Sequence, residues 1–221
     1  MSLINFIDGI VTRSVSVREK TNRFLAPLRR RQLRGKDKPA FTIISNNCWA
    51  GHVYRYFGLP YDTPTIGLYL YTADYLKFLK DLERYIKEVE PVFIRPDESK
   101  WADDLKEKGI DCPIGRLDDI EVLFLHYKSE DEARQKWERR KKRIHWDKLF
   151  IKMSEQNLCT EDDIREFDSL PYKNKIIFTH KDYQIPSQVI FKEFEASGEV
   201  LNDTIHFNRY VDLAKWINSG L

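Results

Sequence analysis

The sequence has few cysteines and no long apolar run. Only three of its 221 residues are cysteines, Cys48, Cys112 and Cys159, and no two of them stand at CxxC spacing. An odd number of widely spaced cysteines fits neither a closed disulfide framework nor a common zinc motif, so we expect a reducing, cytoplasmic setting and no metal site. No segment approaches the roughly 20 apolar residues of a membrane span. Asp8 interrupts the first apolar run and no basic segment precedes it, which argues against a secretory signal peptide.

Motifs that bind nucleotides are also missing. The chain has no Walker loop, no GxGxxG and no Asp-x-Asp metal motif, which counts against a standard nucleotide enzyme. The segment "WERRKKRIHW", 137–146, interleaves basic and aromatic residues as some nucleic-acid-binding surfaces do. Cations are favoured at the C-terminus of any helix, however, so we expect no nucleic-acid partner.

Charge is distributed unevenly along the chain. Residues 1–38 hold ten basic and three acidic residues, a net charge of +7, whereas the whole chain carries +2. A helix through the start of this segment would gather its apolar residues on one side: Leu3, Ile4, Ile7, Ile10 and Val11. We therefore expect a basic, amphipathic, helical arm at 1–38 and a single domain at 39–221. Such an arm predicts attachment to an anionic membrane, at its inner face, or to membrane-bound polysaccharide machinery. The alternative is a helix that packs on its own acidic domain.

Short apolar segments alternate with amphipathic ones beyond residue 39. We expect strands at 41–45, 65–71, 91–95, 119–127, 148–154, 174–180 and 188–194. We expect helices at 48–57, 73–89 after an N-cap at Thr72, 129–144 after a capping box of Ser129 and Glu132, from Thr160 onward, and at 208–218. This alternation predicts an α/β fold with three layers, in which helices cover both faces of a mostly parallel sheet.

Ligands of such sheets bind beyond the carboxyl ends of the strands, where this chain places Ser45, Asn46, Asn47 and Cys48. A helix N-terminus lowers the pKa of a thiol, and the thiolate is a nucleophile. Asparagine amides can donate hydrogen bonds to an oxyanion, and His52, one helical turn after Cys48, can act as a base. The alternative is structural: serine and asparagine are ordinary helix caps, and a lone cysteine is usually a small buried apolar residue.

Two more histidines end predicted strands. His126 closes "FLH" and His180 closes "FTH", so both can meet Cys48 at the sheet edge, and Asp182 or Asp118 can orient one of them. Tyr69, in the predicted strand 65–71, can stack on a sugar ring. Each of these residues also has an ordinary structural alternative, as a solvated histidine or a core aromatic.

Three blocks of the sequence carry a resemblance to a known family. They are "IISNNCWAGHVYRYFGLPYDTPTIGLYLYTADYLKFLKDLERYI", "DDIEVLFLHYKSEDEARQKWERRKKRI" and "LPYKNKIIFTH". Over most of residues 41–180 the chain resembles the family called domain of unknown function 1919, whose members are often encoded among genes for capsular or exopolysaccharide synthesis. The resemblance implies a role in the synthesis of such polysaccharides.

A looser resemblance concerns Asn47 and Cys48. The pair is similar to the "GNCQ" block of capsule-biosynthesis acetyltransferase-like proteins that bind coenzyme A, and also to a family described as papain-like cysteine peptidases. Asn46 and Trp49 stand where that block has glycine and glutamine. This similarity implies acetyl-coenzyme A as cofactor, with Cys48 as a nucleophile or as a neighbour of the reacting carbonyl.

The expected function is transfer of an acyl group, most concretely acetyl, to a sugar hydroxyl of a polysaccharide precursor. Cys48, His52, His126 and His180 are the expected catalytic residues. The expected oxyanion-holding or substrate-binding residues are Ser45, Asn46, Asn47, Trp49, Tyr69 and Asp182. One alternative is a glycosyltransferase-like enzyme that uses a sugar nucleotide. Another is a non-catalytic scaffold of a polysaccharide-assembly complex, docked through its basic arm.

Overall fold

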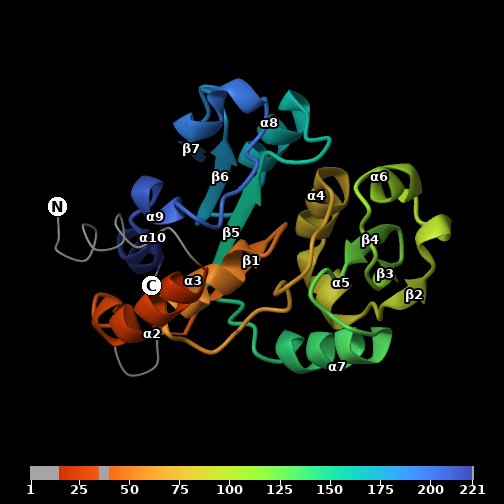
Figure 1. Ribbon diagram of the computed structural model, residues 1–221, viewed down its shortest axis with the longest axis horizontal. Helices are drawn as coiled ribbons and strands as arrows, with labels where there is room; N and C mark the ends of the chain where they lie inside the picture. Colours follow the sequence, from red (N-terminus) through yellow and green to blue (C-terminus); the bar gives the residue numbers. More distant parts are fainter. Residues whose placement is uncertain (1–14, 35–39, 221) are drawn as a thin grey trace.

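The structure is a computed structural model that describes residues 15–34 and 40–220. Its helices are α2 (Val15–Arg30), α3 (Trp49–Phe57), α4 (Thr72–Lys80), α5 (Leu82–Lys87), α6 (Ala102–Glu107), α7 (Glu130–Lys141), α8 (Glu161–Ser169), α9 (Phe207–Tyr210) and α10 (Leu213–Ser219), with 3₁₀ turns η1 (Pro96–Glu98) and η2 (Lys192–Ser197). Its strands are β1 (Thr42–Ser45), β2 (Val92–Ile94), β3 (Ile114–Leu117), β4 (Ile120–Leu123), β5 (Leu149–Ser154), β6 (Lys175–Thr179) and β7 (Gln188–Ile190). Figure 1 shows how these elements are arranged.

The central element is a parallel sheet of four strands in the order β1-β5-β6-β7. The register pairs Ser45 with Lys152 and Ser154 with Phe178, so the carboxyl ends of β1, β5 and β6 lie at one edge. The long excursion from β1 to β5 contains every element from α3 to α7. The predicted α/β class and the predominance of parallel strands are confirmed.

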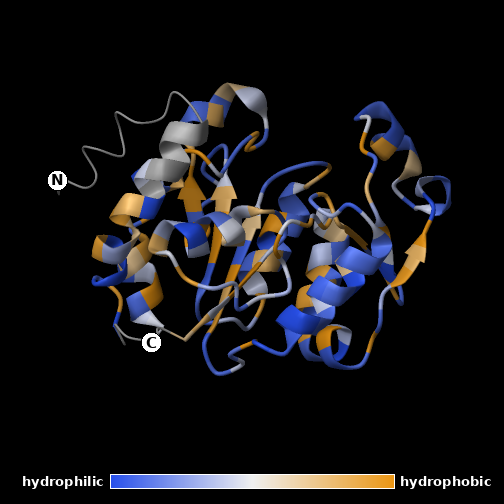
Figure 2. Cartoon of the chain, turned by 60° about the horizontal axis from the view of Figure 1, so that its bottom comes forward, coloured by the Kyte–Doolittle hydropathy of each residue, from blue (hydrophilic) through white to orange (hydrophobic). Residues whose placement is uncertain are grey.

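Helices cover both faces of this sheet. Successive residues of a strand point to opposite faces, and both sets are apolar here, so both faces must be shielded from water. Ile44, Ile151, Met153 and Ile177 point into a core shared with α4, α5 and α8. The alternate strand residues Ile43, Phe150, Ile176 and Phe178 point into a second core shared with α3, α9 and α10. Figure 2 shows the apolar strands in the middle of the molecule and more hydrophilic helices around them. The three-layer arrangement is therefore confirmed.

A second, antiparallel sheet, β2-β3-β4, lies beside α4 and was not anticipated. The predicted strand 119–127 is the short strand β4 of this sheet, and β3 was missed because "IGRL" has no clear apolar alternation. Gly115 of β3 is required by close packing, since a Cβ there would lie 2.8 Å from the Phe124 ring. The predicted strand 65–71 is wrong: it forms only a bridge between Tyr69 and Leu123, and Gly67 bends it with φ 71°.

Three predicted boundaries also need correction. The helix at 73–89 is divided into α4 and α5 at Asp81, whose φ of −137° is not helical. Tyr71 instead of Thr72 occupies the N-cap position, without a capping bond from its side chain. The predicted strand 188–194 ends at Ile190, and the chain then forms the 3₁₀ turn η2. The helix at 208–218 is two short helices, with Asp212 capping the second through a hydrogen bond from the Lys215 amide. In contrast, the predicted N-caps Ser129 and Thr160 are confirmed, because each side chain accepts from the third helical amide.

The described part of the basic arm is a helix packed on the domain. Leu25, Ala26 and Leu33 are buried, and α2 lies against α3. Arg29 is also buried, with its guanidinium 3.9 Å above the Tyr56 ring. The predicted apolar stripe at residues 3–11 lies outside the described residues. Within 15–34 and 40–220, no helix is long and apolar enough to cross a membrane.

Candidate functional site

The junction from β1 to α3 is built from side-chain caps. The Ser45 hydroxyl accepts a hydrogen bond from the Ala50 amide at 3.3 Å and donates to the Asn47 carbonyl at 2.7 Å. The Asn47 side-chain oxygen accepts from the Trp49 amide at 3.1 Å. These bonds satisfy amides that the first turn of a helix leaves without partners. Ser45 and Asn47 therefore have the capping role that was the structural alternative.

Asn46 continues the pairing of β1 and β5 with its side chain. Its amide oxygen accepts from the Ser154 backbone N–H at 3.0 Å, and its amide nitrogen donates to the Ser154 carbonyl at 3.2 Å. The nitrogen of the Asn47 amide is also engaged, with Gln156 at 2.9 Å and Asp203 at 2.8 Å. Both amide nitrogens thus already have acceptors within the protein, with which an oxyanion would compete, and the expectation that they hold one stays a prediction.

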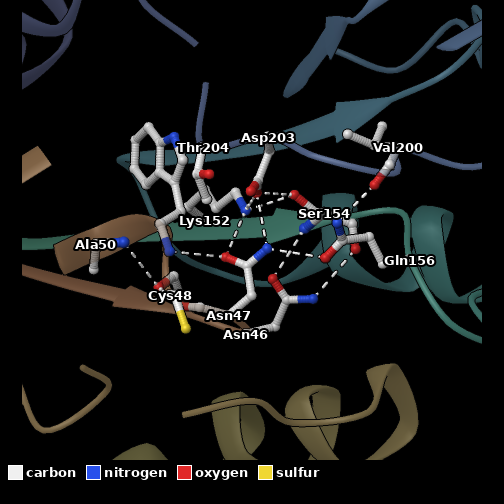
Figure 3. Close-up of polar contacts among 12 residues, drawn as sticks. Asn46, Asn47, Cys48, Ala50, Lys152, Ser154, Gln156, Val200, Asp203 and Thr204 are labelled. Carbon is white, nitrogen blue, oxygen red and sulfur yellow. Dashed lines mark hydrogen bonds and ion pairs between the residues drawn. The ribbon is translucent and has the colours of Figure 1, made fainter. Parts of the chain in front are cut away.

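Beside Asn47 lies a buried charged network that was not predicted (Figure 3). The Lys152 ammonium contacts the Asp203 carboxylate, the Asn47 oxygen at 3.1 Å and the Ser154 hydroxyl at 2.5 Å. The Ser154 hydroxyl also donates to Asp203 at 2.5 Å. Lys152 further lies over the aromatic ring of Phe178, at 4.9 Å. The network ties the carboxyl end of β5 to the segment that precedes α9.

Burial and charge shift the pKa values of this network in ways that fit an ion pair. Burial alone would raise the pKa of Asp203, but the charge of Lys152 and the hydrogen bonds from Asn47, Lys152 and Ser154 hold it below its usual range. Burial lowers the pKa of Lys152, and the charge of Asp203 opposes that shift. Each charge thus depends on the other.

Cys48 follows Asn47 as the residue before α3, and Figure 3 shows its sulfur pointing away from the charged network. Burial, with a smaller contribution from the charge of Asp203, raises the pKa of the Cys48 thiol to about 11, while Lys152 and Arg55 oppose the shift. The expectation of a lowered pKa is therefore wrong, because desolvation outweighs the effect of the helix N-terminus. The thiol is predominantly protonated at neutral pH.

One side of Cys48 opens into a hollow of about 820 Å³, which we call the basic pocket. Arg23 and Arg30 of α2, His52 and Arg55 of α3, and His126 supply its basic groups. Its apolar wall is formed by Ala26, Pro27, Phe57, Leu59, Tyr61 and Ile66. None of its described lining residues is acidic. The pocket thus offers positive charge together with an apolar surface.

The wall of the basic pocket is held by a buried arginine from the predicted basic segment 137–146. Arg140 donates to the Ile66 carbonyl at 3.2 Å and to the Tyr127 hydroxyl at 2.5 Å. Its guanidinium also lies 5.5 Å from the centre of the Tyr61 ring. Arg140 therefore holds Ile66 and Tyr61, two residues of the apolar wall, in position.

The other side of Cys48 borders a smaller hollow of about 290 Å³, which we call the polar pocket. Its polar lining residues are Asn47, Gln156, Asn157, Glu199, Asn202, Asp203 and Thr204, and its apolar ones are Tyr69, Leu125, Val200 and Leu201. Cys48 lines both pockets. It therefore marks the boundary between a cationic hollow and one rich in amides and carboxylates.

Two of the predicted histidines reach the same pocket as Cys48. His52 and His126 both line the basic pocket. His126 does so although it lies beyond the end of β4 and belongs to the antiparallel part of the molecule; its backbone amide is anchored by the Gly67 carbonyl at 3.0 Å. Cys48 and His126 thus line one pocket, but the expected sharing of that cleft with both asparagines is not met, because Asn47 lines the polar pocket and Asn46 lines neither.

The remaining predicted residues, His180, Asp182, Trp49 and Tyr69, do not line the basic pocket. His180 pairs with the buried Glu155, its Nδ1 being 2.8 Å from the carboxylate, and neither residue lines the basic or the polar pocket. Asp182 accepts from the Gln184 amide at 2.7 Å and so shapes a turn instead of orienting a histidine. Trp49 is fully buried among Phe178, Phe207 and Trp216, because α3 turns its first side chain into the core. Tyr69 lines the polar pocket.

Comparison with known proteins supports the family resemblance. The model of the family called domain of unknown function (DUF1919) matches residues 18–218. The chain belongs to this family. It is also 35% identical over 187 residues to a Haemophilus influenzae protein described as uncharacterized, an alignment that covers 80% of this chain and 84% of that protein. The matched region contains α3, both pockets and the described residues of α2 from Arg18 onward.

Proposed function

We propose that the protein is a transferase of capsular or exopolysaccharide synthesis that moves an acetyl group from acetyl-coenzyme A to a sugar hydroxyl. The basic pocket is the observation that carries this proposal. Arginines recognise phosphate groups through paired, charge-assisted hydrogen bonds, and Arg23, Arg30 and Arg55 line the pocket. Its apolar wall suits the pantetheine arm of the same cofactor. The polysaccharide setting rests on the sequence resemblance alone.

The state of Cys48 favours direct transfer over an acyl-cysteine intermediate. A thiol with a pKa near 11 supplies little thiolate at neutral pH. In direct transfer, the acceptor hydroxyl attacks the thioester carbonyl beside Cys48, and His126 or His52 takes the hydroxyl proton. The new C–O bond forms, the C–S bond of the thioester breaks, and the imidazolium returns its proton to the departing coenzyme A thiolate. Cys48 then only shapes the surroundings of the carbonyl.

A thermal-shift screen tests the donor. Saturating acetyl-coenzyme A or coenzyme A should raise the Tm in proportion to the logarithm of its concentration, because a ligand of the folded state stabilises it. Arg30→Ala and Arg55→Ala should reduce that shift, whereas Arg95→Ala, an exposed arginine of the segment before η1, should not. A shift with sugar nucleotides alone would favour the glycosyltransferase-like alternative, and no shift with any of these ligands would favour the scaffold.

We also propose that the arm holds the protein at the cytoplasmic face of an anionic membrane or on membrane-bound polysaccharide machinery. Phe24 and Leu28, one helical turn apart on α2, are 79% and 44% exposed. Arg31 and Arg34 are exposed nearby. Exposed apolar side chains flanked by basic ones are typical of helices that lie on a membrane surface.

A further inference from the structure

The polar pocket has the composition of a saccharide site. Amide and carboxylate side chains, which can each bond to ring hydroxyls, come from the carboxyl end of β5 and from residues 199–204. Leu125, Val200 and the ring of Tyr69 supply apolar surface, on which the C–H face of a sugar can rest. Several polar groups are held in place by hydrogen bonds. The Gln156 side chain donates to the Val200 carbonyl at 2.6 Å, and the Glu199 carboxylate accepts from the Asn157 backbone N–H at 2.6 Å. The site is thus preorganised.

The hydroxyl of one aromatic side chain in its wall is not fully satisfied. Tyr69 is only 7% exposed, and its hydroxyl makes no hydrogen bond of normal geometry within the described residues, with the Asn157 side chain as its polar neighbour. An unpaired buried hydroxyl costs free energy. A ligand acceptor that entered the polar pocket beside Asn157 and reached this hydroxyl would remove that cost.

The charges around this pocket select against anionic ligands. Glu199 and Asp203 line it, and no lysine or arginine is among its described lining residues. Lys152 lies behind it but is committed to Asp203. Lys108 reaches Asn157 at 2.8 Å but is paired with Asp104, also at 2.8 Å. A carboxylate or phosphate on the sugar would therefore meet the Glu199 carboxylate, and no described lining residue would supply a counter-charge, since Lys152 already neutralises Asp203.

We propose that the polar pocket binds a neutral hexose or N-acetylhexosamine unit of the acceptor. This inference rests on the proposed function, since it assigns the acceptor to the side of Cys48 opposite the donor. Cys48 lines both pockets, so a sugar hydroxyl at its edge of the polar pocket adjoins the acyl group of a donor in the basic pocket. The two substrates then approach Cys48 from opposite sides.

Saturation-transfer NMR of the full chain with simple methyl glycosides tests this site. Methyl glucoside or methyl N-acetylglucosaminide should receive saturation, and methyl glucuronide, which differs from the glucoside by its carboxylate, should not. The Tyr69→Phe variant should bind the neutral glycoside about 3- to 10-fold more weakly, as expected for one lost hydrogen bond, with an unchanged or higher Tm. The control Tyr85→Phe, which removes a hydroxyl bonded to Asp119, should bind it normally.

The measurement is made with and without coenzyme A, so that the two proposals can fail separately. No transfer to any neutral glycoside in either condition, equal binding of the glucuronide, or full affinity in Tyr69→Phe would overturn the saccharide site. Binding of a neutral glycoside without any thermal shift from coenzyme A or acetyl-coenzyme A would leave the saccharide site in place and refute the proposed donor.

Discussion

Lys152 and Asp203 form an ion pair whose side chains are 0% and 1% exposed. Lys152 belongs to β5 and Asp203 to the segment before α9, so the pair fixes residues 199–204 over the carboxyl end of the sheet. Those residues form one wall of the polar pocket. Asn47 contacts both charges, and the ion pair therefore links the cap of α3 to that wall.

Removing one charge of this pair should destabilise the fold strongly. Asp203→Leu leaves the Lys152 ammonium buried without its counter-charge, and such losses typically cost about 3–5 kcal/mol. Lys152→Met should have a similar effect, whereas the double variant Lys152→Met/Asp203→Leu should recover most of the stability because no buried charge remains. Urea unfolding of the three variants measures this. Additive losses in the double variant would show that the two residues are not coupled.

The same pair should make the protein acid-sensitive. The folded-state pKa of Asp203 lies below its unfolded value of about 3.9, so its contribution to stability is present above that value and is lost as the pH falls toward the folded pKa. We expect the free energy of unfolding of the wild type to fall as the pH drops below about 5. The Lys152→Met/Asp203→Leu variant should lose less over this window, by an amount that urea unfolding at each pH measures. If the free energy of unfolding depends on pH equally in both proteins, Asp203 is not the source of the acid sensitivity.

Cys48 should react slowly with alkylating agents in the folded protein. Its pKa of about 11 means that the iodoacetamide reaction should accelerate with pH up to about pH 11, without a plateau near pH 8.5. Burial also raises the pKa of Cys112 to about 11 and that of Cys159 to about 12, so Cys48 should not stand apart from Cys112. Mass spectrometry of each cysteine, with the protein unfolded in urea as control, measures the rates. A plateau near neutral pH at Cys48 would restore the thiolate mechanism.

Gly58 links the position of α2 to the basic pocket. It caps α3 with φ 64°, and an added Cβ would lie 2.9 Å from the Ala26 Cβ. Gly58→Ala should therefore cost the roughly 1–2 kcal/mol of a left-handed alanine and also push α2 away, which weakens donor binding through Arg23 and Arg30. Gly109→Ala is the matched control, because Gly109 has φ 61° and open space around its Cβ position. If the two variants are equally stable and bind the donor equally, α2 does not form the pocket.

The main sheet was predictable because its strands are short apolar runs bounded by polar segments. "FTIIS", "KLFIKMS" and "NKIIFTH" match β1, β5 and β6 closely, since both faces of these strands are buried and no alternation dilutes the signal. The antiparallel sheet was not predictable in this way. "TIGLYLY" has the composition of a strand, yet Gly67 and the path of the chain toward α4 leave it with a single bridge.

The strand-end rule pointed to Ser45–Cys48, and of these residues Asn47 and Cys48 line the two pockets, whereas the chemistry assigned to them stays a prediction. The rule on strand ends was applied to the predicted strands 41–45, 119–127 and 174–180. It was not applied to 148–154, where it would have singled out Glu155, Gln156 and Asn157. Lys152 also left a signal, since a lysine inside a strand buried on both faces must have a buried partner. Its partner Asp203 lies in a loop without any pattern, and only the fold brings the two together. The pKa of Cys48 likewise depends on burial that the sequence does not show.

Membrane attachment through α2 predicts a specific loss when its exposed apolar residues are changed. The variant Phe24→Ser/Leu28→Ser should sediment less with vesicles that contain anionic lipid, because the removed side chains no longer insert. Each basic residue near an anionic surface contributes about 1 kcal/mol, so wild-type binding should persist at low salt and weaken as salt screens these charges. The control Leu158→Ser removes a side chain that is 63% exposed on another part of the surface and should bind like the wild type.

A truncated chain that begins at Pro39 separates this attachment from the structural role of the helix. Truncation removes Leu25, Ala26 and Leu33 from the surface of α3, so the shortened protein should unfold at lower urea concentration as well as lose vesicle binding. The double variant keeps those buried residues and should lose only vesicle binding. If wild type and double variant both ignore anionic vesicles at low salt while the truncated chain is unstable, then the described arm has a structural role and the membrane proposal is wrong.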